Sequence, residues 1–131
     1  MSASDDLFGH VSPKPDGSEI FRQLAQAAAE RILIMDGAMG TEIQQLGFVE
    51  DHFRGERFGA CNCHQQGNND LLTLTQPKAI DEIHYHYAIA GADNLETNTF
   101  SSSRIAQADY GMEDMVYDLN RDGARLARRA A

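Results

Sequence analysis

The chain has 131 residues, with 20 acidic and 11 basic side chains and a formal net charge of −9 at pH 7. Its length fits one domain at most, and its 42% hydrophobic residues are typical of a globular protein rather than a disordered acidic tail. The acidic balance disfavours nucleic acid and anionic membranes as partners. No apolar run approaches the roughly 20 residues that cross a bilayer, and we expect a cytoplasmic protein.

The first elements are predicted from breakers and from apolar spacing. Residues 1–18 are rich in serine, glycine and proline and are expected to form a flexible N-terminal arm. Ser18 can cap a helix that runs to about Glu30, with apolar residues at every third or fourth position. Residues 32–35 are a continuous apolar run of strand length, typical of a strand buried on both faces.

The second half begins with a long polar stretch. Residues 47–76 show no clear period, which indicates a functional loop or a misread element, and we favour the loop. Pro77 opens a helix that ends at Gly91. The β-branched residues of 94–100 predict a second strand, and the apolar residues after Met112 predict a final helix with a basic C-terminus.

Strands that alternate with helices indicate an α/β fold with a parallel sheet. Two strands alone would leave their edges and faces uncovered, which proteins normally avoid. We therefore expect residues 19–131 to form the opening βα units of a larger domain.

Polar residues follow both predicted strands, at the strand ends where parallel sheets bind their ligands. A carboxylate there is costly unless it meets a cation or several donors, so Asp36 and Glu96 are candidates to hold a substrate ammonium group. Gly37 and Gly40 allow a ligand carboxylate to reach backbone N–H groups. Together these features suit an amino acid.

Other interpretations of these residues stay open or are disfavoured. In a purely structural interpretation, Asp36 and Gly37 form a tight turn and Glu96 binds a neighbouring backbone. A glycosidase pair of Asp36 and Glu96 is disfavoured, because nothing fixes the separation of the two carboxylates. A phosphate loop lacks its lysine and its glycine spacing.

Metal binding is also disfavoured. Cys61, Cys63 and His64 are candidate zinc ligands, but their spacing is not the usual CxxC and a fourth ligand is missing. Two cysteines so close together give no disulfide framework and favour a reducing compartment. His84 and His86 lie two apart on a predicted helix and point to different sides, which excludes a shared metal.

Four segments of the chain resemble the N-terminal homocysteine-binding domain of cobalamin-dependent methionine synthase, in the homocysteine S-methyltransferase family. FRGERF and GNNDLL favour the cobalamin-dependent branch over betaine-dependent relatives. The resemblance covers about residues 30–131. The segments are residues 31–41 (RILIMDGAMGT), 51–58 (DHFRGERF), 67–72 (GNNDLL) and 91–100 (GADNLETNTF).

The resemblance implies a (β/α)8 TIM barrel, of which this chain would supply roughly the first two of eight units. It also implies methyl transfer from methylcobalamin to the thiolate of zinc-bound homocysteine, which yields methionine. By motif, Asp36 would hold the homocysteine ammonium, Gly37 would offer backbone donors and Thr97 would contribute a hydroxyl. Glu96 and Phe100 would line the same pocket.

The zinc-binding cysteines of the family lie late in the barrel, whereas Cys61 and Cys63 fall in an early loop. We therefore expect this chain to make substrate contacts only and to bind neither zinc nor cobalamin by itself. Its expected partners are homocysteine and the remaining barrel segment or other methionine synthase domains. The alternative is a stand-alone, non-catalytic module that binds a small molecule or a partner.

Overall fold

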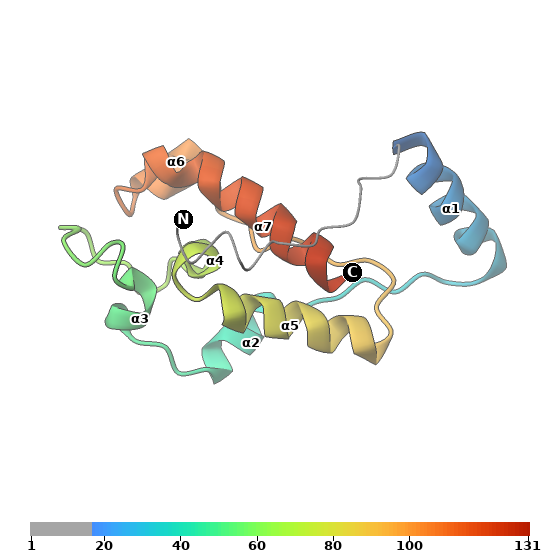
Figure 1. Cartoon of the computed structure of the whole chain (residues 1–131), viewed down its shortest axis with the longest axis horizontal. Helices are drawn as coiled ribbons and strands as arrows, with labels where there is room; N and C mark the ends of the chain where they lie inside the picture. The colour runs from blue at the N-terminus through green and yellow to red at the C-terminus, as the bar shows by residue number, and fades with distance from the viewer. Residues whose placement is uncertain (1–16) are drawn as a thin grey trace.

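A computed structural model describes residues 17–131, so most of the predicted N-terminal arm, residues 1–16, lies outside the described residues. Helices dominate the described part (Figure 1). None of them is long and apolar enough to span a membrane. The α-helices are α1 (Gly17–Glu30), α2 (Met39–Gln45), α3 (Glu50–Arg54), α4 (Leu72–Thr75), α5 (Pro77–Ala90), α6 (Arg104–Ala108) and α7 (Val116–Ala130), and two 3-10 turns are η2 (Asn69–Leu71) and η3 (Glu113–Met115).

Three predicted helices are confirmed where apolar spacing and end signals agree. α1 begins at Gly17, so Ser18 lies inside its first turn and does not occupy the predicted capping position. α5 has Pro77 at its start and ends at Gly91, whose φ of 103° is the left-handed conformation that glycine adopts freely. α7 carries Arg128 and Arg129 in its last turn, where cations meet the negative end of the helix dipole.

The predicted α/β fold is wrong, and with it the expected opening βα units of a TIM barrel. In the described residues the two predicted strands meet in a single parallel β-bridge, between Met35 and Asn94. The N–H of Asp36 donates to the carbonyl of Asn94 at 2.9 Å, but no further described segment extends the pairing into a sheet. The apolar run 32–35 is therefore uncovered, and Ile32 is 87% exposed. A short apolar run becomes a buried strand only where neighbours pair with it and cover it.

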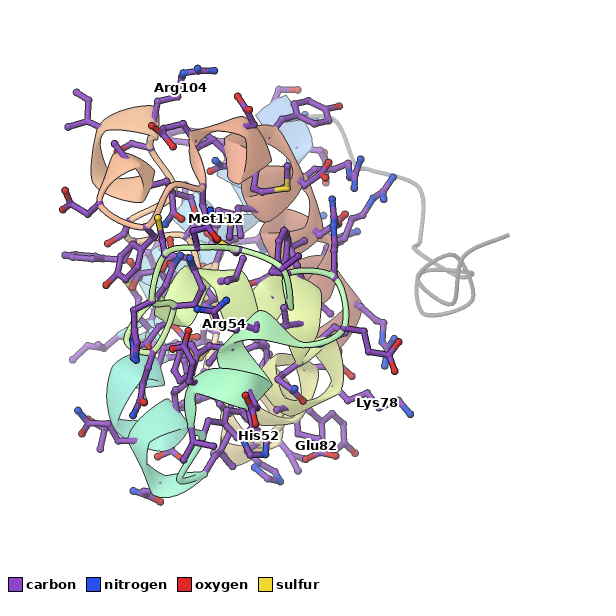
Figure 2. All side chains as sticks on the ribbon, turned by 90° about the vertical axis from the view of Figure 1, so that its left-hand side faces the viewer. His52, Arg54, Lys78, Glu82, Arg104 and Met112 are labelled. Atoms are coloured by element: carbon purple, nitrogen blue, oxygen red, sulfur yellow. The ribbon has the colours of Figure 1, made fainter. Side chains whose placement is uncertain are left out.

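The predicted loop 47–76 is wrong in part, since it contains α3, η2 and α4. Glu50 and Arg54 tie its middle to α3: Glu50 accepts the N–H of Gln65 at 2.8 Å, and Arg54 donates to the carbonyl of Cys63 at 2.9 Å. Burial pushes the pKa of the Glu50 carboxyl upward, but backbone N–H groups and Arg54 outweigh it, so this pKa lies below its usual value. Figure 2 shows Arg54 between Met112 and His52.

The core consists of two clusters that join distant parts of the chain. α5 lies along α7 in Figure 1, and both helices contribute to the first cluster. α1 lies apart from the other helices and buries no residue. The first cluster contains Ile43, Phe53, Leu72, Ile80, Ile83 and Leu126, and the second contains Leu71, Met112 and Leu119.

Gly123 allows α7 to approach the segment that follows the β-bridge. A Cβ at this position would lie 2.7 Å from Cγ2 of Thr99, well inside van der Waals contact. The hydroxyl of Thr99 is 2.6 Å from the hydroxyl of Thr97, and rotation of Thr99 away from α7 would break this hydrogen bond. The absence of a side chain at Gly123 therefore sets the position of the Thr97–Thr99 segment.

His84 occupies the buried side of α5. Its side chain is fully buried, and within the described residues neither ring nitrogen has a hydrogen-bond partner. His86 is exposed, which confirms that the two histidines point to different sides. Burial lowers the pKa of His84, although the carboxylates of Asp36 and Asp81 act in the opposite direction. The imidazole is therefore held in its neutral form.

We expect Gly123→Ala to lower the free energy of unfolding by about 1 kcal/mol, because overpacking of about 1–3 kcal/mol outweighs a helix-propensity gain of about 1 kcal/mol. In a Thr99→Ser background, which lacks the methyl group, the same substitution should stabilise by up to about 1 kcal/mol. Urea unfolding of the four proteins measures both effects. Equal destabilisation in both backgrounds would show that contact with Thr99 is not the cause.

We expect the stability to fall as the pH drops below 6.5, the ordinary histidine pKa, because the unfolded chain then binds a proton that folded His84 excludes. The loss is complete once the pH is below the lowered pKa of the folded state. Chemical unfolding between about pH 5 and pH 8 should show that His84→Leu removes this part of the pH dependence. His86→Leu, the matched exposed control, should retain it; a slope unchanged in His84→Leu would refute the assignment.

Candidate functional site

Two extended segments, residues 32–36 and 93–98, lie side by side through the β-bridge and lead into the site. Arg31 forms two hydrogen bonds with the Asp93 carboxylate, at 2.5 and 2.8 Å, and Asp93 also accepts the N–H of Ile34 at 2.9 Å. The Arg31 guanidinium, helped by this N–H, lowers the pKa of Asp93 to about 2. Asp93 thus stays ionised at neutral pH and holds the two segments together.

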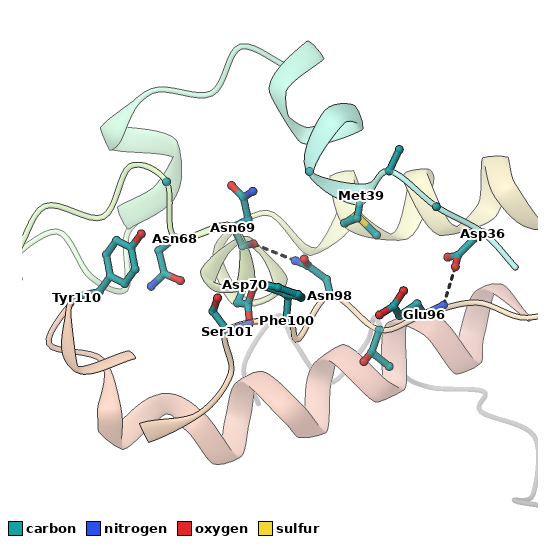
Figure 3. A pocket seen from close by; sticks show the side chains of 15 residues that line it. Asp36, Met39, Asn68, Asn69, Asp70, Glu96, Asn98, Phe100, Ser101 and Tyr110 are labelled. Atoms are coloured by element: carbon teal, nitrogen blue, oxygen red, sulfur yellow. Dashed lines mark hydrogen bonds between the residues drawn. The ribbon is translucent and has the colours of Figure 1, made fainter. Parts of the chain in front are cut away.

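A cavity of about 290 Å³ opens where these segments end. Figure 3 shows Asp36 and Glu96 at one end of it and Tyr110 at the other. Segments far apart in the sequence line it, namely 36–40, 67–70, 96–98 and 100–101. The structure brings all five predicted site residues to this cavity, and their role in substrate binding stays a prediction: Asp36, Gly37, Glu96, Thr97 and Phe100.

Two carboxylates give one end of the cavity an acidic character. Asp36 accepts the N–H of Glu96 through Oδ1 at 2.9 Å, so Asp36 has the backbone-binding role that the structural interpretation gave to Glu96. The second oxygen of Asp36 and both carboxylate oxygens of Glu96 accept no hydrogen bond from residues 17–131. Such oxygens can hold a cation, for example a substrate ammonium group.

The backbone next to Asp36 approaches the cavity closely. A Cβ at Gly37 would meet no atom within 4 Å, so packing does not require glycine there, whereas access of a ligand to the backbone would. Ala38 has a φ of 46°, in the left-handed region that costs a non-glycine residue roughly 1–2 kcal/mol. Strain of this kind clusters at functional sites, and Ala38 lines the cavity. Phe100 is 98% exposed.

Asp70 holds the loop that follows the second extended segment. Its Oδ2 accepts the N–H of Ser101 at 2.8 Å and the hydroxyl of Ser102 at 2.6 Å. Burial raises the pKa of Asp70, and the hydrogen bonds from Ser102 and Ser101 offset this only in part. Asp70 and Ser101 both line the cavity, so this buried carboxyl fixes a stretch of its wall.

A buried amide pair fixes the opposite end of the same wall. Asn68 and Gln107 exchange hydrogen bonds of 2.9 and 3.1 Å between their side chains. Gln65 donates to the carbonyl of Tyr110 at 2.8 Å, which attaches the Tyr110 turn to the same network. Our sequence reasoning assigned no site role to these residues. The available signal was the polar run within GNNDLL, directly before the apolar Leu71.

Cys61, Cys63 and His64, the candidate zinc ligands of the early loop, do not form a metal site in the described residues. Among residues 17–131, no three His, Cys, Asp or Glu side chains come together as a metal site. Cys63 is exposed, and His64 lies with its Nδ1 3.1 Å from a carboxylate oxygen of Glu50. Cys61 accepts a hydrogen bond from Gln65 at 3.5 Å. Donors of the right type are thus present but are engaged separately.

Comparison with protein families places this site in a known context. The model of the family described as homocysteine S-methyltransferase matches residues 33–131, which is most of the chain and includes every residue that lines the cavity. The match agrees with the resemblance of the sequence motifs. The chain therefore belongs to the homocysteine S-methyltransferase family.

Proposed function

We propose that this chain provides homocysteine-binding residues of a methyltransferase of the cobalamin-dependent methionine synthase type, located in the cytoplasm. The observation that carries the proposal is the acidic end of the cavity. Asp36 and Glu96 come from distant parts of the chain, and both present carboxylate oxygens that no described residue occupies. Family membership supports homocysteine as the substrate class.

The geometry suggests how an amino acid would be oriented. Its ammonium group would lie against Asp36 and Glu96, because that end of the cavity concentrates negative charge. Its carboxylate, bonded to the same carbon as the ammonium group, would lie beside it and bind backbone N–H groups near Gly37 and the hydroxyl of Thr97. Met39 also lines the cavity and offers an apolar contact for the methylene carbons.

In the branch that the motifs resemble, zinc holds the homocysteine thiolate and methylcobalamin supplies the methyl group. Residues 17–131 do not fit the zinc site, so the proposed contribution of this chain ends at binding and orienting homocysteine. The remaining barrel segment or other domains of the enzyme are the proposed partners. The second candidate is a non-catalytic module that binds a small molecule or a partner, and it would use the same cavity.

Substitution of Asp36 tests the proposal. Asp36→Asn keeps an oxygen for the N–H of Glu96 but removes the negative charge, so the local fold should survive. We expect calorimetric titration with L-homocysteine under reducing conditions to show binding that is roughly 10-fold to 100-fold weaker than that of the unsubstituted chain. Asp109→Asn, an exposed control outside the cavity, should bind as tightly as the unsubstituted chain.

Two outcomes would contradict the proposal. If the unsubstituted chain unfolds cooperatively but binds no homocysteine, the non-catalytic module with a different ligand becomes the better explanation. If it binds homocysteine and Asp36→Asn binds equally well, the acidic end of the cavity is not where the ammonium group lies.

A further inference from the structure

Asn98 lies in the wall of the cavity between its two ends. Figure 3 shows it between Asn69 and Glu96, and the residue is 5% exposed. It does not belong to the site residues predicted from the sequence. An amide buried to this degree needs a hydrogen-bond partner for its NH₂ group and another for its carbonyl oxygen.

Hydrogen bonds fix the orientation of the Asn98 amide. Its Nδ2 donates to the carbonyl of Asn69 at 2.9 Å and to the hydroxyl oxygen of Thr73 at 3.2 Å. A carbonyl oxygen only accepts hydrogen bonds, so the nitrogen of the Asn98 amide, and not its oxygen, must face Asn69. The amide therefore cannot flip without placing two oxygens against each other.

The Oδ1 of Asn98 is left without a partner. It accepts no hydrogen bond from residues 17–131. In the described residues, the fully enclosed polar side-chain atoms without a partner are the two ring nitrogens of His84, so the Oδ1 of Asn98 is not fully enclosed. Asn98 lines the cavity, so its unpartnered oxygen belongs to a residue of the cavity wall. A fixed acceptor of this kind discriminates strongly between ligands with and without a matching donor.

We propose that Asn98 is a specificity-determining residue, whose Oδ1 accepts a hydrogen bond from the ammonium group of the substrate amino acid. The proposal rests on the proposed function and refines it. Asp36 and Glu96 attract a cation by charge, whereas Asn98 adds a direction, because its amide is held by Asn69 and Thr73. Its oxygen would also repel a carboxylate or thiolate, so the substrate would enter in one orientation.

The test compares two variants and two ligands. Asn98→Ala removes the acceptor, and Thr73→Val removes one partner of Nδ2 while leaving Oδ1 in place. The ligands are L-homocysteine and 4-mercaptobutyrate, which keeps the thiol and the carboxylate but lacks the ammonium group. Calorimetric titration gives the dissociation constants, and circular dichroism checks that each variant stays helical.

We expect Asn98→Ala to bind homocysteine about 10-fold to 100-fold more weakly, because it loses a hydrogen bond to a charged group. Its dissociation constant for 4-mercaptobutyrate should stay within about 2-fold of that of the unsubstituted chain. Thr73→Val should change both constants by no more than about 3-fold. Equal losses for both ligands, or unchanged homocysteine binding by Asn98→Ala, would overturn the role of Asn98 while leaving the proposed function intact. Absence of homocysteine binding by the unsubstituted chain would overturn both.

Discussion

Buried polar side chains hold the cavity wall in this molecule, where a sheet would use backbone hydrogen bonds. Asp70 holds the loop at Ser101, and Asn98 holds the loop at Asn69, each through bonds between a side chain and the backbone. A sheet tolerates many side chains because its ladder is made by the backbone. Here the shape of the wall depends on residue identity, since the loss of one partner leaves another polar group buried and unpaired.

Part of the excess of acidic residues has a structural role. Several carboxylates accept hydrogen bonds from other parts of the chain: Glu50 accepts backbone N–H groups of the loop, and Asp93 joins Arg31 to Ile34. Asp36 does the same for Glu96. The net charge of −9 thus arises partly from groups that connect irregular segments of the described part of the chain.

The sequence predicted the parts of the fold whose signals are local. The helices at Gly17–Glu30, Pro77–Ala90 and Val116–Ala130 have amphipathic spacing and end signals, and these act within a few residues. The strands were predicted wrongly because the run 32–35 has the composition of a buried strand, but burial depends on distant segments that pair with it. The short helix Met39–Gln45 was missed, since its glycine and its seven residues leave little periodicity to detect.

The candidate site was likewise predictable only where its signals are local. Asp36 and Glu96 were found because carboxylates after apolar or β-branched runs are conspicuous, and the structure brings both to one cavity. Asn98 and Asp70 were not assigned, because their importance lies in partners that are 25 to 32 residues away in the sequence. No local pattern encodes such pairs, although a polar residue directly before an apolar run is a usable hint.

The hydrogen bond between Asp36 and the N–H of Glu96 joins residues 60 positions apart and has a kinetic consequence. Closing so long a loop costs chain entropy, whereas the helices form from contacts only a few residues apart. The cavity should therefore order late, after helices such as α5 and α7 have formed, and open before these helices unfold when the molecule fluctuates. Amide hydrogen exchange around Glu96 would then be faster than in the helices, and a bound amino acid would slow it by joining the two segments.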